Sequence, residues 1–304
     1  MCTKVKRTMD RVRHLIVRHF LVPKPKIQRS PRLKLTSEPD AAGSSSAFDH
    51  SLWDGILKAY VSPGIHLAGG VITSTIDYAA VSADPRFDEY LQLLAGADCG
   101  ALPPAELLAL LMNAYNTFCV GHVVAHHRTT LNADSPPSTV SSITALKRDG
   151  VSVWDLPAGI LGGRPVTLGE LEHTWLRGNF DEPGLHFAIV CASASCPDLR
   201  PEAYSGEPGR LREQLAEQAT AFFSNETKGL KVDASTGVLT ASPLHMWYAD
   251  DFGGAEAALR WMADALPASM DAVAASIRRR GFFSAPPQYF AYDWSLNGTP
   301  RSHG

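Results

Sequence analysis

The residue types best suited to chemistry gather between positions 186 and 199, in the stretch HFAIVCASASCPDL. This stretch contains His186, Cys191 and Cys196. A cysteine thiol has an ordinary pKa of about 8.5, so at neutral pH it needs a neighbouring base or an electropositive loop to become a nucleophile. We therefore predict a thiol site here, with the two cysteines as candidate nucleophiles and His186 as a candidate base.

A second candidate base comes from a different segment. Residues 185–191 are typical of a buried strand, and side chains along a strand alternate between its two faces. In that geometry His186 points away from the first cysteine. His173, with Glu172 beside it in the preceding helix, has no such constraint. We therefore expect His173 to lie across from the cysteine loop, residues 191–196.

The cysteine loop has several uses that the sequence leaves open. Its small residues, among them Ser193 and Ser195, would let backbone amides face an anion or a developing oxyanion, or would simply make a tight crossing. Cys191 could equally pack as a small apolar side chain. The loop could also close a Cys191–Cys196 disulfide if the two Cα atoms come within about 7 Å, although it lacks the Cys-x-x-Cys spacing of thioredoxin-like sites.

Metal binding is weakly supported by the residue spacing. Two cysteines with His173 and His186 would supply four zinc ligands, but their spacing matches no standard zinc motif. A stripe of Cys119, His122 and His126 on one predicted helix includes no carboxylate. We expect neither a metal nor a cofactor.

Two buried amides mark the predicted helix from Glu106 to His127. This helix is apolar nearly all round, which places it in the core. Asn113 and Asn116, with Tyr115 between them, lie three residues apart and so share one helix face. A buried amide without a partner costs about 1–3 kcal/mol, so these amides should clamp neighbouring loops or bind a ligand.

A further group of polar and aromatic residues follows later in the chain. Trp247, Tyr248 and Asp251 form either a core plug with a turn-forming acid or a pocket wall whose carboxylate orients a histidine. Arg177 stands near the end of the helix that carries His173. We expect a polar pocket where four segments converge: residues 113–116, 171–177, 186–196 and 247–251.

The elements that must position these residues are mostly helices. Periodicity and capping residues predict helices over residues 48–61, 85–95, 106–127, 167–178, 208–224, 255–266 and 269–279. Hairpins are expected within 159–166 and 230–241, and single strands at 185–191 and 290–296. The predicted fold class is α+β: a mostly helical single domain, residues 48–298, with a small sheet and hairpins.

Composition and charge narrow the classes of function. The 304-residue chain is 45% hydrophobic and 19% charged, which is ordinary for a globular protein. Residues 1–34 hold eleven of the 28 Lys and Arg but one acid, so the remaining chain has seventeen bases against thirty acids. An acidic body argues against nucleic-acid binding at the main domain. No apolar run reaches the roughly 18–20 residues of a membrane-spanning helix.

Cysteine usage and the N-terminal segment bear on location. Five cysteines, thinly spread, are not a disulfide framework and indicate a reducing compartment, so we expect a cytoplasmic protein. Residues 1–20 read as a basic amphipathic helix that could contact an anionic membrane surface, act as an organelle-targeting peptide, or remain a solvated tail. Residues 21–47 read as a disordered linker, and residues 299–304 as a tail.

Five motifs, in this order, resemble a known family: NAYN at 113–116, LEHTWLRGN at 171–179, HFAIVCASASCP at 186–197, WYADDF at 247–252 and YDWSLN at 292–297. The family is DUF547, which has no assigned function. The resemblance covers nearly all of residues 50–298. It implies that these residues occupy motif positions: Asn113, Tyr115, Asn116, Glu172, His173, Arg177, His186, Cys191, Trp247, Tyr248 and Asp251. The chain departs from the family pattern at Gly121, where the family carries a histidine, and many relatives have serine in place of Cys196.

Two functions are consistent with these residues. The first is a cysteine/histidine-dependent hydrolase or transferase, which requires a reactive thiol in the cysteine loop. The second is a non-catalytic regulatory or adaptor module, which would use the same pocket to bind a small molecule or a partner peptide.

Overall fold

The computed structural model describes residues 47–131, 140–280 and 286–298. The predicted basic helix over residues 1–20, nearly all of the predicted linker and the tail lie outside these ranges.

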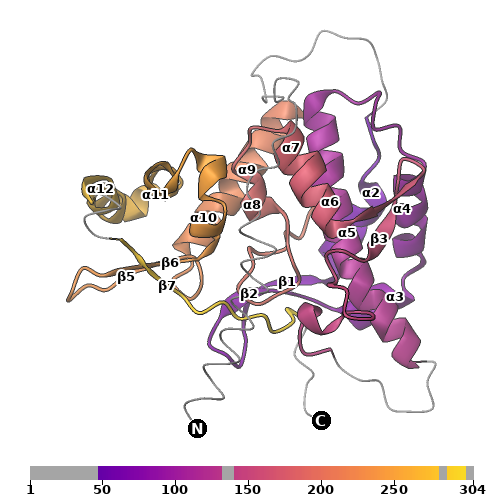
Figure 1. Cartoon of the computed structure of the whole chain (residues 1–304), viewed down its shortest axis with the longest axis horizontal. Coiled ribbons are helices and arrows are strands. Elements are labelled where there is room, and N and C mark those ends of the chain that lie inside the picture. The colour runs from indigo at the N-terminus through magenta and orange to yellow at the C-terminus, as the bar shows by residue number, and fades with distance from the viewer. Residues whose placement is uncertain (1–46, 132–139, 281–285, 299–304) are drawn as a thin grey trace.

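The described residues form the predicted α+β fold, in which helices predominate and strands are short (Figure 1). The helices are α2 (Ser51–Tyr60), α3 (Tyr78–Ala83), α4 (Pro85–Ala95), α5 (Pro104–Leu131), α6 (Leu168–Glu170), α7 (Arg177–Asn179), α8 (Leu185–Ala188), α9 (Pro208–Ser224), α10 (Leu244–Trp247), α11 (Ala255–Asp264) and α12 (Asp271–Arg279). The strands are β1 (Val61–His66), β2 (Ile72–Ile76), β3 (Pro157–Leu161), β4 (Arg164–Thr167), β5 (Leu230–Val232), β6 (Leu239–Ala241) and β7 (Gln288–Tyr289). A π-helical turn, Leu171–Leu176, joins α6 to α7.

Within the described residues, the strands make three small sheets. β1 and β2 form an antiparallel hairpin, and so do β3 and β4. The third sheet has the order β5-β6-β7, with β5 antiparallel and β7 parallel to β6. Both predicted hairpins are therefore confirmed. The β1–β2 hairpin was not predicted.

Helix α5 packs against α3, α6, α9 and β3, whereas α11, α12 and the β5–β7 sheet lie on the opposite side of the molecule (Figure 1). By length and composition it could span a membrane, but 83% of its most apolar stretch is buried inside the protein. It is the core helix that its apolar sequence predicts. Its side chains join one hydrophobic cluster that reaches from Trp53 in α2 to Ile277 in α12.

The two amides of α5 fasten other segments to it. Asn113 accepts a hydrogen bond from the Tyr204 backbone N–H and donates one to the Tyr204 carbonyl, both at 2.9 Å. Asn116 donates to the Ala188 carbonyl at 3.0 Å and accepts from the Val190 N–H at 2.8 Å. Of the two roles expected for these amides, the structure shows the loop clamp. The second clamp fixes the start of the cysteine loop.

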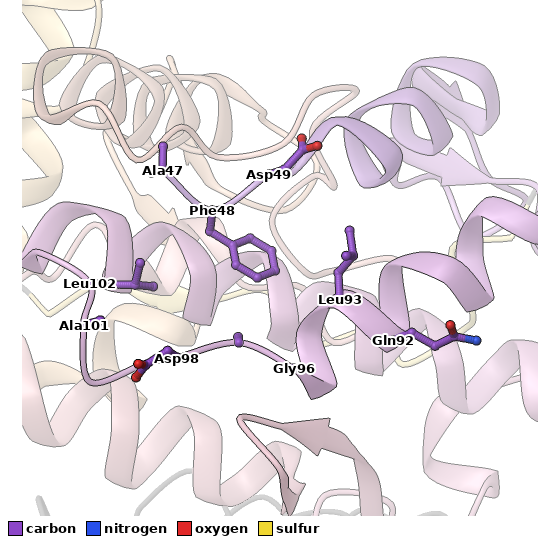
Figure 2. Close-up of a pocket in the computed structure, with 10 residues that line it drawn as sticks. Ala47, Phe48, Asp49, Gln92, Leu93, Gly96, Asp98, Ala101 and Leu102 are labelled. Carbon is purple, nitrogen blue, oxygen red and sulfur yellow. The ribbon is translucent and has the colours of Figure 1, made fainter. Parts of the chain in front are cut away.

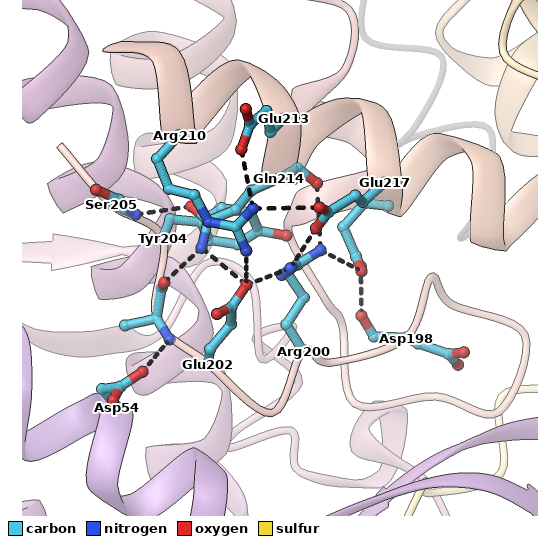
Figure 3. A network of polar contacts seen from close by, with 12 residues as sticks. Asp54, Asp198, Arg200, Glu202, Tyr204, Ser205, Arg210, Glu213, Gln214 and Glu217 are labelled. Atoms are coloured by element: carbon cyan, nitrogen blue, oxygen red, sulfur yellow. Dashed lines mark hydrogen bonds and ion pairs between the residues drawn. The ribbon is translucent and has the colours of Figure 1, made fainter. Parts of the chain in front are cut away.

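An ion-pair network fastens the segment that follows the cysteine loop (Figure 3). Arg200 reaches Glu217 in α9 at 2.8 Å and also pairs with Glu202. Arg210 in α9 reaches Glu202 from the other side at 2.7 Å. These pairs hold residues 200–202 against α9, so the loop is anchored at both ends.

Two local predictions were wrong. The predicted strand over residues 185–191 begins instead as the short helix α8, and residues 189–191 belong to no strand. Every residue of this run is buried, so it carries no alternating pattern that separates strand from helix. The predicted last strand, 290–296, is not formed: β7 ends just before it, at Tyr289, and within it there are isolated bridges at Ser295 and Leu296.

Candidate functional site

Cys191 and Cys196 form a disulfide that closes the cysteine loop, with their Cα atoms 6.3 Å apart. Both residues are buried, with 7% and 4% of their surfaces exposed. The backbone N–H of Cys191 lies 3.0 Å from Cys196 Sγ. Of the uses left open for this loop, the structure therefore shows the disulfide.

A tyrosine hydroxyl touches both sulfur atoms. Tyr292 Oη lies 3.2 Å from Cys196 Sγ and 3.4 Å from Cys191 Sγ. Ser193 Oγ lies 3.3 Å from the same hydroxyl and 3.1 Å from Cys191 Sγ. We call these four residues the disulfide site. Within the described ranges, no imidazole is a hydrogen-bond partner of either sulfur.

The backbone of the cysteine loop is held by the C-terminal segment. The amides of Ala194 and Ser195 donate to the carbonyls of Ser295 and Asp293, at 2.8 and 3.1 Å. These two amides are thus committed to backbone carbonyls, which favours the tight-crossing interpretation over an oxyanion hole. Ala192 has a φ of 57°, a conformation that is unfavourable for a residue with a Cβ. The many fixed contacts of the loop hold Ala192 in this strained conformation.

A buried lysine supports the loop from the opposite direction. Lys228 Nζ donates to the Cys196 carbonyl at 2.7 Å and to the Ala194 carbonyl at 3.4 Å. It also reaches Thr73 Oγ1 in β2 and Asp198 Oδ1, each at 2.7 Å. Burial lowers the pKa of Lys228, although Asp198 counteracts this. The ammonium group ties the loop to β2.

Five of the other predicted residues form a second cluster, which we call the charged network: Glu172, His173, Arg177, His186 and Asp251. At its centre Asp251 Oδ2 lies 2.6 Å from Arg177 Nε and 2.7 Å from His186 Nε2. Burial by itself raises the pKa of Asp251, but His186 and Arg177 outweigh it and hold that pKa well below its ordinary range. Burial lowers the pKa of His186, so its ring is neutral at neutral pH.

These partners show which ring nitrogen of each histidine accepts a hydrogen bond. Because Asp251 is ionised, His186 Nε2 carries the proton, which leaves Nδ1 as an acceptor. His186 Nδ1 is buried and has no hydrogen-bond partner in the described part of the chain. His173 Nδ1 lies 2.9 Å from Arg177 Nη1, which can only donate, so this nitrogen also accepts.

The charged network includes a buried carboxylate held by two tyrosines. Glu172 accepts hydrogen bonds from Tyr248 Oη at 2.6 Å and from Tyr115 Oη at 3.3 Å. Burial raises the pKa of both tyrosines well above the ordinary value, so both hydroxyls remain donors. The π-helical turn carries Glu172 and His173, and such turns are frequent at functional sites.

Aromatic rings connect the two clusters. The ring of Tyr248 stacks on His186 at 3.8 Å and lies 5.0 Å from the Arg177 guanidinium. Its neighbour Trp247 packs on Tyr292 of the disulfide site, at 5.1 Å between ring centres. The negative charge of Glu172 also contributes to the raised pKa of Tyr292, after the larger effect of burial. The two clusters are therefore neighbours.

The four predicted segments come together, but they leave little open space. The depression beside the charged network measures about 10 Å³, roughly room for one water molecule. Its lining is Arg177, Phe180, Asp181, Glu182, Pro183, Leu185 and Asp251. The predicted polar pocket is thus filled by its own side chains in this state.

A larger cavity lies elsewhere on the molecule. It has a volume of about 500 Å³ and is lined by residues 47–49 with parts of the segment 92–102 (Figure 2). Phe48 and Leu93 supply apolar surface to it, and Asp49 and Asp98 supply two carboxylates. It shares no lining residue with the disulfide site or the charged network.

The structure thus distributes the predicted site residues over two groups. His186 meets Asp251 and Arg177, whereas the cysteines meet each other. The four-ligand zinc set is therefore not assembled. Among the described residues, no group of three or more His, Cys, Asp or Glu side chains could hold a metal ion.

Sequence reasoning missed two residues of the site. Tyr292 stands in the YDWSLN motif but was not singled out, and Lys228 lies in no motif. The only available signal for Tyr292 was its motif. A lysine four residues after the end of α9 gives no sign that it is buried.

Comparison with known proteins gives one match. Residues 100–223 match the family described as "Protein of unknown function, DUF547". This match confirms the resemblance inferred from the motifs, three of which lie within these residues. No curated protein and no solved structure matches the chain.

Proposed function

We propose that this chain, whose residues 100–223 are a DUF547 segment, carries a thiol–disulfide exchange site in which Cys191 and Cys196 alternate between a disulfide and two thiols. The observation that carries the proposal is the Cys191–Cys196 disulfide itself, with one tyrosine hydroxyl in contact with both sulfurs. Oxidation removes two electrons and two protons from the thiols. The co-reactant is a disulfide, which accepts them and becomes a pair of thiols.

The surroundings of the pair suit reversible exchange. The two sulfurs are held together by the loop, so each is the natural resolving partner of the other. A resolving cysteine in contact protects a thiol from irreversible oxidation to sulfinic and sulfonic acids. The small exposure of both residues restricts attack to slender thiol reagents or to a partner that opens the loop.

The expected cytoplasmic location is part of this proposal. Cytoplasmic thiol pools keep most cysteines reduced, so a disulfide there is typically transient, catalytic or redox-sensing. In that setting the closed loop is the oxidised state of the site.

A cysteine/histidine-dependent hydrolase or transferase is the second candidate, and one observation favours it. Asp251 binds His186 Nε2 and leaves Nδ1 as an acceptor, which is the carboxylate–histidine arrangement that orients a general base. This function would require reduction of the disulfide and movement of Cys191 towards the ring. An adaptor module would instead tolerate Cys191→Ser without loss of cellular function.

The test is a redox titration of the full chain. The protein is equilibrated in mixtures of reduced and oxidised dithiothreitol, quenched with an alkylating reagent, and analysed by mass spectrometry of the peptide that contains both cysteines. We expect both thiols to change state together, reversibly, with a midpoint above about −300 mV, the upper bound typical of structural disulfides.

Variants that lack one cysteine of the pair supply the control. Cys191→Ser and Cys196→Ser should each abolish the two-electron transition. A pair that can be reduced only by unfolding the protein would contradict the proposal. If Cys196→Ser leaves a Cys191 thiol that reacts with iodoacetamide at unusually low pH, the hydrolase or transferase is favoured instead.

A further inference from the structure

We propose that Tyr292 is a catalytic residue of the exchange reaction, and that its hydroxyl donates a hydrogen bond to Cys196 Sγ so that Cys196 is the sulfur that leaves when the disulfide is reduced. This inference rests on the proposed function and adds to it which sulfur is attacked and which one leaves.

The contacts of the two sulfurs are unequal. Cys196 Sγ faces two donors: the backbone N–H of Cys191 at 3.0 Å and the Tyr292 hydroxyl at 3.2 Å. Cys191 Sγ faces the Ser193 hydroxyl at 3.1 Å and lies farther from Tyr292, at 3.4 Å. A hydrogen bond to the charged form of a group favours that form. The surroundings therefore stabilise a thiolate at Cys196 more than at Cys191.

Tyr292 is held in the donor state. Burial raises the pKa of Tyr292, so the hydroxyl keeps its proton throughout the pH range in which thiols ionise. The Ser193 hydroxyl donates to Tyr292 Oη, which aligns the chain Ser193 to Tyr292 to Cys196. Trp247 packs on the Tyr292 ring and holds it in place.

The proposed reaction follows from this asymmetry. A thiolate of a dithiol reductant attacks Cys191 Sγ, a mixed disulfide forms at Cys191, and the bond to Cys196 breaks with its electron pair left on Cys196. The new thiolate accepts hydrogen bonds from Tyr292 and from the Cys191 N–H. The second thiol of the reductant then loses its proton to solvent. The resulting thiolate attacks the reductant sulfur that is bonded to Cys191, which closes the disulfide of the oxidised reductant. Cys191 is released as a thiolate and takes up a proton. The leaving thiol of lower pKa leaves faster.

The experiment measures the pH dependence of alkylation in two variants of the full chain that each keep one cysteine of the pair. Cys191→Ser leaves Cys196, and Cys196→Ser leaves Cys191. Iodoacetamide labelling of that thiol is followed, between pH 5 and pH 10, by mass spectrometry of the peptide that contains it, which separates it from Cys2, Cys99 and Cys119. We expect Cys196 to ionise at lower pH than Cys191. Adding Tyr292→Phe to the Cys191→Ser background should raise the apparent pKa of Cys196 by about one unit, a tenfold loss of thiolate at fixed pH.

Tyr289→Phe is the matched control, because Tyr289 lies three residues earlier and stacks on His245 at 5.4 Å. It should leave the apparent pKa of Cys196 unchanged. If Tyr292→Phe does not fold, the inference is still tested by comparing the apparent pKa of Cys196 in Cys191→Ser with that of Cys191 in Cys196→Ser. A lower pKa at Cys191, or no shift in a folded Tyr292→Phe protein, overturns the inference while reversible cycling stands. Failure of cycling in the redox titration overturns the proposed function itself.

Discussion

At the scale of single residues, Asp251 has two charged or ionisable partners, Arg177 and His186, whereas the sequence suggested at most one histidine. One oxygen of its carboxylate binds both Arg177 and His186, and the side chains of all three are less than a tenth exposed. Removing one partner of a buried ion pair leaves an uncompensated buried charge. The stability of this region therefore depends on Asp251 more than on either histidine.

Asp251→Asn should lower the free energy of unfolding by about 3–5 kcal/mol, because the Arg177 charge would remain buried without its partner. Guanidinium denaturation followed by tryptophan fluorescence measures this. Asp264→Asn is the matched control: Asp264 pairs with Arg278 at 2.8 Å, but both side chains are at least half exposed. The control should change stability by less than about 1 kcal/mol. Equal effects of the two substitutions would contradict the argument.

At the scale of elements, the cysteine loop is fixed by segments that lie far from it in the sequence. Helix α5 holds its start through Asn116, and the C-terminal segment pairs with its middle. Lys228, just after α9, holds its end. The loop can open only if one of these three supports is released.

Lys228→Met should loosen the loop, because the Cys196 carbonyl loses its donor and Asp198 loses its counter-charge. We expect the free energy of unfolding to fall by about 1–3 kcal/mol and reduction of the disulfide by dithiothreitol to become several-fold faster. Stopped reactions analysed by alkylation and mass spectrometry measure the rate. Lys231→Met serves as the control, because Lys231 is an exposed residue of β5, and it should leave the rate unchanged. An unaltered reduction rate in Lys228→Met would show that the lysine does not hold the loop.

At the scale of the whole molecule, buried and partly buried histidines with lowered pKa recur in separate parts of the fold. Burial lowers the pKa of His50, beside α2, and of His122, in α5, to about 4 in each case. Burial also lowers the pKa of His186 in α8 and of His245 in α10. All four shifts have the same sign, so their effects on stability add.

Stability should therefore fall on mild acidification. An unfolded histidine has an ordinary pKa of 6.5, so between about pH 6.5 and 4 the unfolded chain binds protons that the folded protein does not. In this window the free energy of unfolding decreases as pH falls, by on the order of 2 kcal/mol at pH 5 for each of His50 and His122. Denaturation at pH 7, 6 and 5 measures the slope, and His122→Gln should reduce it. A flat profile across this range would contradict the prediction.

The sequence by itself determined the elements whose signals are local. The bounds of α4 and α9 agree with the predicted residues. A proline in the first turn and the apolar periodicity are both read within the helix itself, so they do not depend on the rest of the fold. The core position of α5 and the clamping role of Asn116 followed from burial of polar amides in an apolar helix. The turn of the β3–β4 hairpin followed from Gly162 and Gly163, which both adopt positive φ.

Only the tertiary structure decided how the chemical groups are paired. A wholly buried run such as residues 185–191 has no solvent-facing side, so its pattern cannot separate α8 from a strand. The partners of the cysteine loop lie 96 residues away at Tyr292 and 32 residues away at Lys228. Contacts at such separations depend on how whole elements pack, and no local spacing encodes them. The sequence therefore identified the cysteine loop as a candidate site. Packing decided that the two cysteines contact each other and Tyr292 instead of His173.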